Sequence, residues 1–192
     1  LALETLNVST FESITSLTFP VTTTLTDIDV AQLSVPVIDL SLLEGDIDFR
    51  IVGSRVNVNI IYPNLNTALK RLELSSINFP TVDVSPMIGL ERFELSSTST
   101  ESFQLPNTNT LTSIRIWGHE INVPVDLSIV PQLTNLDIRG NNGSTPLQID
   151  LTSNLELTSI TLERDLMNSV DLTQNTKVTR LDVSNNSLTS LD

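Results

Sequence analysis

The stretch Leu111-Thr112-Ser113-Ile114-Arg115-Ile116 decides the fold, because its pattern of apolar positions recurs along the whole chain. The next two copies are Leu133-Thr134-Asn135-Leu136-Asp137-Ile138 and Leu157-Thr158-Ser159-Ile160-Thr161-Leu162. Nine copies start at residues 3, 25, 46, 69, 90, 111, 133, 157 and 178, so successive starts differ by 21 to 24 residues. A fixed period of roughly 20 to 50 residues is the signature of a repeat architecture. Because the copies fill the chain, we expect one domain over residues 1–192.

Each copy alternates apolar and polar residues, which is the spacing of a β-strand and not of a helix. A second alternating segment follows in each repeat, as in Val82-Asp83-Val84, Val125-Asp126-Leu127 and Ile149-Asp150-Leu151. Residues typical of turns (Ser, Thr, Asn, Pro and Gly) lie between the two segments. The pattern predicts an all-β-dominated repeat solenoid, a right-handed superhelix of parallel strands with little helix. Its Leu, Ile and Val side chains should stack from turn to turn into one core.

The last repeat reads Val178-x-x-Leu181-Asp182-Val183-Ser184-Asn185-Asn186-x-Leu188-x-x-Leu191-Asp192. This frame resembles the leucine-rich repeat, and most of all the short bacterial subclass of about 21 residues per repeat. In that subclass a second L-x-x-L-D-L segment replaces the usual helix. The resemblance implies that the first strands form a concave sheet whose intervening residues face solvent. The family's turn asparagine is matched at Asn141 and Asn186, whereas other repeats have Ser54, Ile77, Thr98, His119 and Asp165 there.

Composition excludes several classes of function. The chain has 10 Lys and Arg against 23 Asp and Glu, a formal net charge of −13, so we expect no nucleic-acid partner. Without cysteine there is no thiol chemistry, and the single histidine, His119, which we place in a solvated turn, leaves little room for acid–base catalysis. No catalytic motif or Gly-rich phosphate loop is present, so we expect no enzyme activity and no cofactor. No apolar run approaches the roughly 18 residues of a transmembrane segment.

The polar positions of the first strands carry the candidate binding residues. Neighbouring parallel strands lie about 4.8 Å apart, so Glu94, Arg115 and Asp137 should form a row of alternating charge. Trp117 should lie beside Arg139, close enough for cation–π stacking. We take Trp117, Arg115, Arg139, Arg92, Glu94 and Asp137 as ligand-binding residues of the concave face. The alternative is that these charges only pair across strands for register and solubility, which leaves the solvent-facing tryptophan unexplained.

A column of aspartates marks the second segments. Stacked carboxylates repel, so either Ca²⁺ at Asp83, Asp126, Asp150 and Asp171 or hydrogen bonds from the turns must offset the cost. We favour hydrogen bonds from Ser or Thr two positions on, and expect no metal, because the glycine-rich nonapeptide pattern of calcium-binding repeats is missing. The column consists of Asp39, Asp83, Asp126, Asp150, Asp171 and Asp192.

These features predict a non-catalytic recognition module of an extracellular or surface bacterial protein, with a protein partner on the concave face. The alternatives are an adhesion module for anionic polysaccharide and a structural spacer without a ligand. Neither end of the sequence has the polar cap that repeat arrays need. We therefore expect a piece of a longer protein, or ends covered by partners, including self-association through the terminal repeats.

Overall fold

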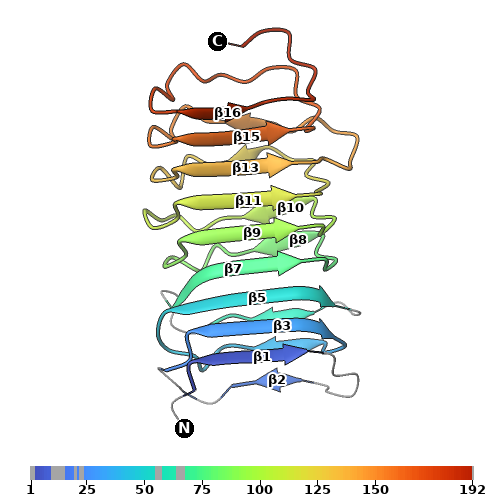
Figure 1. The fold of residues 1–192 in the computed structure, drawn as a ribbon, viewed down its shortest axis with the longest axis vertical. Helices are drawn as coiled ribbons and strands as arrows, with labels where there is room; N and C mark the ends of the chain where they lie inside the picture. Colours follow the sequence, from blue (N-terminus) through green and yellow to red (C-terminus); the bar gives the residue numbers. More distant parts are fainter. Residues whose placement is uncertain are drawn as a thin grey trace.

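A wholly parallel nine-stranded sheet, here called the long sheet, dominates the computed structural model, which describes residues 3–9, 16–19, 21, 24–54, 58–63 and 68–191 (Figure 1). Each of the nine repeats contributes one strand, and the strands follow one another across the sheet in chain order. They are β1 (Thr5–Ser9), β3 (Asp27–Leu33), β5 (Ile47–Ser54), β7 (Leu69–Ser75), β9 (Arg92–Ser96), β11 (Ser113–Trp117), β13 (Asn135–Arg139), β15 (Ser159–Glu163) and β16 (Arg180–Asp182).

The second segments form shorter strands behind the long sheet. In Figure 1 the front strands run left to right, the rear strands run right to left, and the chain climbs towards the C-terminus. That is a right-handed coil, as predicted, and the described residues contain no helix. The rear strands are β2 (Leu17–Thr18), β4 (Val37–Asp39), β6 (Asn59–Ile61), β8 (Thr81–Asp83), β10 (Ser102–Gln104), β12 (Val125–Asp126) and β14 (Ile149–Asp150).

The rear strands pair in three separate groups, β2-β4-β6, β8-β10 and β12-β14. Proline explains the break between the last two groups. Pro124 stands directly before β12 at the place aligned with Ser102, and it has no N–H to donate to a ladder. The segment Val170-Asp171-Leu172 continues the sequence pattern but forms no strand.

The core lies between the two sets of strands. The register stacks equivalent apolar residues, so that Ile114 lies between Phe93 and Leu136 on the neighbouring strands. Burying a side chain of this size contributes about 1.5–3 kcal/mol, and the stack repeats it in every turn. The apolar positions of the first segments are buried as predicted: Leu72, Leu74, Leu95, Ile114, Ile116, Leu136, Ile138, Ile160 and Leu162.

A left-handed residue marks the corner at the end of each long-sheet strand from the second repeat on. The backbone N–H of the corner residue still bonds to the next strand. The N–H of Ser97 donates to the Trp117 carbonyl (2.7 Å), and the N–H of Gly118 donates to the Arg139 carbonyl (3.0 Å). A left-handed backbone costs an L-residue about 1–2 kcal/mol, a cost that glycine avoids. The corner residues are Gln32, Gly53, Ser76, Ser97, Gly118, Gly140, Arg164 and Asn185.

Two buried asparagines tie successive turns together at the opposite corner. The amide nitrogen Nδ2 of Asn154 donates to the carbonyls of Leu127 (2.9 Å) and Val130 (3.1 Å). That of Asn175 donates to the carbonyls of Leu151 and Asn154, both at 3.0 Å. This ladder was not predicted, because the equivalent place in earlier repeats holds residues of several types, among them Leu43, Met87, Thr108 and Val130.

Candidate functional site

The outward side chains of the long sheet form one continuous surface, here called the long-sheet face. Arg115 on β11 is the register partner of Glu94 on β9 and of Asp137 on β13. Trp117, two residues further along β11, is the register partner of Arg139. The predicted row of alternating charge is therefore present, and the three neighbouring strands β9, β11 and β13 carry all six candidate residues.

Trp117 and Arg139 form the predicted cation–π pair. The guanidinium carbon of Arg139 lies 5.1 Å from the centroid of the indole ring. Such a pair contributes about 0.5–1 kcal/mol at an exposed site. The indole is nevertheless 39% exposed. A large aromatic ring thus lies at the surface in a fixed position, since a neighbouring guanidinium holds one of its faces.

Asp137 fixes the orientation of Arg139. Arg139 Nε donates to Asp137 Oδ1 at 2.7 Å and Nη2 donates to Oδ2 at 2.5 Å, a bidentate pair within one strand. This hydrogen bonding, with the charges of Asp137, Glu163 and Asp182, raises the pKa of Arg139, so the guanidinium stays charged. The expectation that Asp137 faces solvent was wrong: only 8% of the residue is exposed, because the guanidinium lies across its carboxylate.

Arg71 bridges two glutamates that oppose each other across strands. Glu73 and Glu94 are register partners, an arrangement that repels. Arg71 Nη2 lies 3.0 Å from Glu73 Oε2 and 3.0 Å from Glu94 Oε1, which offsets the repulsion. Arg115 adds a looser contact, its Nη1 being 3.9 Å from Glu94 Oε2. Pairing of charges across strands is therefore present as well, and its centre is Arg71, which was not among the six candidate residues.

Arg92 stands apart from this pairing. It is exposed, and it makes no ion pair within the described part of the chain. Its register partner on β7 is Arg71, whose guanidinium turns to the glutamates instead. Arg92 lies on the same strand as Glu94, so it extends the cluster of candidate residues towards the start of β9.

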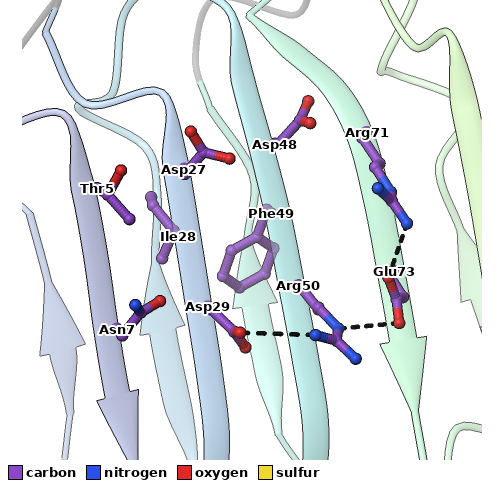
Figure 2. Close-up of a pocket in the computed structure, with 10 residues that line it drawn as sticks. All are labelled: Thr5, Asn7, Asp27, Ile28, Asp29, Asp48, Phe49, Arg50, Arg71 and Glu73. Carbon is purple, nitrogen blue, oxygen red and sulfur yellow. Dashed lines mark hydrogen bonds and ion pairs between the residues drawn. The ribbon is translucent and has the colours of Figure 1, made fainter.

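A separate hollow of about 440 Å³ lies over the first four long-sheet strands (Figure 2). Asp27 and Asp48 face each other there, and burial, helped by the charge of Asp27, raises the pKa of Asp48. Arg50 lies between Asp29 (3.6 Å) and Glu73 (2.9 Å), as Figure 2 shows. None of the six candidate residues lines this hollow.

The aspartate column is hydrogen-bonded within its own turns, as we favoured. Each Oδ1 accepts the backbone N–H two residues on at 2.9 to 3.0 Å, and Ser128, Thr152 and Thr173 add their hydroxyls. These bonds lower the pKa of Asp150 and Asp171. In the described ranges no three His, Asp or Glu side chains converge as metal ligands. The described aspartates are Asp39, Asp83, Asp126, Asp150 and Asp171, whereas Asp192 lies outside the described residues.

His119 is buried, so its placement in a solvated turn was wrong. No part of the residue is exposed, and its Nε2 lies 3.2 Å from Oδ1 of the equally buried Asp165. Both stand at the turn position where the resemblance places an inward asparagine. Asn186 does bridge turns there, since its Oδ1 accepts the N–H groups of Asp165 (3.0 Å) and Met167 (3.1 Å).

Asn141, the other predicted ladder asparagine, stabilises its own loop instead. Its Oδ1 accepts the N–H of Gly143 (2.8 Å) and its Nδ2 donates to the Thr145 carbonyl (2.8 Å). The side chain of Asn141 is thus bonded within the loop that the extra residues of this longest repeat form. His119 and Asp165, from the repeats before and after it, contact each other directly.

No protein-family model, curated protein or solved structure matches this chain. The strand topology shows the architecture: the chain is a parallel β-solenoid. This solenoid is compatible with a repeat fold of the kind that the sequence resembles. None of the described residues belongs to a helix long and apolar enough to cross a membrane.

Proposed function

We infer that this β-solenoid is a non-catalytic recognition module of the bacterial leucine-rich repeat type, which binds a protein partner on the long-sheet face, outside the cell or at its surface. The observation that carries the proposal is the cluster of Trp117, Arg139 and Asp137. It combines an exposed indole, a guanidinium stacked on it and a buried carboxylate that locks the guanidinium.

Such a cluster has the composition of an interface hot spot. Trp and Arg are the residues most enriched at positions that dominate binding energy, and they act best when held rigid before the partner arrives. Here two hydrogen bonds to Asp137 fix the Arg139 side chain, and the Arg139 guanidinium stacks on the indole of Trp117. Binding would therefore cost little side-chain entropy, and burial of the indole would contribute about 2 kcal/mol or more.

A carbohydrate-binding role in adhesion is the second candidate, favoured by the same exposed indole, which can stack on a sugar ring. A spacer without a ligand is the third, and it gives the exposed tryptophan no task. The two binding roles differ in the class of molecule retained, so a single variant separates them when it is applied to both classes.

The test compares wild type with Trp117→Ala on protein extracts and on a glycan array. Loss of retained proteins, with circular dichroism unchanged, supports the proposal. Loss of glycans alone supports the second candidate. The matched control is Leu155→Ala, because Leu155 is also a large exposed apolar residue but lies at a corner away from the long sheet. Binding that is equal in wild type and Trp117→Ala would remove the long-sheet face as the site.

A further inference from the structure

The acidic and basic side chains of the long-sheet face differ in exposure. From β7 to β13 the acidic side chains that form ion pairs on this face are largely buried: 16% of the side chain is exposed for Glu73 and Glu94, and 12% for Asp137. The guanidiniums paired with them are far more exposed, 34% for Arg71, 45% for Arg115 and 40% for Arg139. An approaching molecule therefore meets arginine first.

Two arginines of this face, Arg115 and Arg92, have guanidinium donors that no close ion pair occupies. Arg115 approaches Glu94 only to 3.9 Å, while that glutamate is held more closely by Arg71. Arg92 has no ion pair with any described residue and is exposed. A guanidinium offers a planar fork of donors that matches a carboxylate bidentately. Both side chains can thus bind an incoming carboxylate without breaking the pairs that stabilise the sheet.

From this layering we propose that the partner bound at the long-sheet face is an acidic protein segment, whose carboxylates contact Arg92 and Arg115 while an apolar side chain packs on Trp117. The proposal rests on the recognition function proposed above and names the chemistry of its partner. It also means that binding opposes the overall charge of the chain, which is −13. Attraction must come from the local guanidiniums at short range, so it should weaken with salt.

An anionic polysaccharide fits this surface less well than an acidic segment. A sugar ring stacks on an open aromatic face, and the guanidinium of Arg139 leaves it at most one face of the indole. A protein segment can supply carboxylates and aliphatic groups on neighbouring residues. It can therefore satisfy Arg92, Arg115 and Trp117 together, without displacing Arg139.

The experiment uses the emission of Trp117, the only tryptophan of the chain, so that a change reports on this face. Poly-L-glutamate is titrated as the acidic probe, beside poly-L-lysine, heparin and polygalacturonate. We expect a saturable change with poly-L-glutamate that weakens at least about tenfold when salt is raised from about 50 to about 300 mM. The double variant Arg92→Gln/Arg115→Gln should weaken it by about tenfold or more.

The matched control is Lys70→Gln/Lys177→Gln, which also removes two positive charges. These two lysines are paired with Asp46, Glu91 and Glu156. It should bind poly-L-glutamate like wild type. Equal loss in control and test variants would overturn the proposal, and so would saturation by poly-L-lysine or by the two glycans but not by poly-L-glutamate. In those cases Trp117 still reports binding, so the recognition function stands. If no probe and no array ligand changes Trp117 emission, the recognition function fails too.

Discussion

His119 and Asp165 meet inside the solenoid although they stand two repeats apart, with Nε2 of the imidazole 3.2 Å from Oδ1 of the carboxylate. The hydrogen bonds assign the tautomer. Nδ1 accepts the N–H of Ile121 at 3.1 Å, so it carries no proton, and the proton on Nε2 is donated to Asp165. A neutral imidazole therefore faces a buried carboxylate, whose second oxygen has no hydrogen-bond partner.

This arrangement makes Asp165→Asn a stabilising substitution at neutral pH. Burial raises the pKa of Asp165, and it outweighs the hydrogen bond from His119 that lowers this pKa. An amide keeps an acceptor for His119 and removes the buried charge. We expect an increase in the free energy of unfolding of about 1–3 kcal/mol at pH 7, the usual cost of an unsatisfied buried group, measured by urea denaturation.

The pH dependence of that gain has a fixed sign. A carboxyl whose folded pKa is raised stabilises the fold below its unfolded pKa of about 3.9, and this contribution is lost as the pH rises through the folded pKa. The difference between Asp165→Asn and wild type should therefore grow over the same interval. Asp150→Asn is the control with the opposite sign, because hydrogen bonds from Thr152 lower the pKa of Asp150. A gain that does not change with pH would contradict the account.

The strand register was predictable from sequence because it depends on a period-2 pattern repeated nine times. A slip by one residue would turn every core side chain to solvent, so the Glu94–Arg115–Asp137 row and the Trp117–Arg139 contact followed directly. The burial of Asp137 did not follow, since it depends on how the Arg139 side chain folds back. The burial of His119 could have been predicted. His119 occupies the repeat position where the resemblance places an inward asparagine, and this position is better evidence for burial than the polarity of the side chain is against it.

The left-handed corners give a pair of substitutions with opposite effects. Gly118 has φ 65°, and an added Cβ would meet nothing closer than 3.5 Å, so Gly118→Ala acts through backbone strain alone. It should lower the free energy of unfolding by about 1–2 kcal/mol. Ser97, one turn earlier with φ 52°, already carries that strain. Ser97→Gly should therefore stabilise the protein, by about 0.5 kcal/mol after the added chain entropy.

Thermal and urea unfolding of the two corner variants measure both effects. Circular dichroism of each variant should match that of wild type, because the corner N–H groups remain in the ladder. Destabilisation by Ser97→Gly, or no effect of Gly118→Ala, would mean that the corner conformation is not under strain.

Self-association should depend on Leu181. This residue occupies the core position that Leu136 and Ile160 hold in earlier repeats, where they are fully buried, but it is 38% exposed on β16. Among the strands that the structure describes, β16 pairs with β15 alone. An open apolar edge of this kind pairs readily with another chain. Light scattering should show a mass that rises with concentration for this 192-residue chain.

The variant Leu181→Asp places a charge on that edge and should keep the chain monomeric. Trp117→Ala is the control, since it removes an exposed apolar residue from the sheet face and leaves the edge intact. Association that persists in Leu181→Asp but disappears in Trp117→Ala would place the contact on the long-sheet face instead.

Collisional quenching of Trp117 by acrylamide, with and without a ligand retained on the arrays, tests the central claim most directly. The free protein should be quenched readily, because 39% of the residue is exposed. If the long-sheet face is the recognition site, the bound ligand covers the indole and the quenching constant falls several-fold. A complex that forms while the quenching constant of Trp117 stays at its free value would contradict the account.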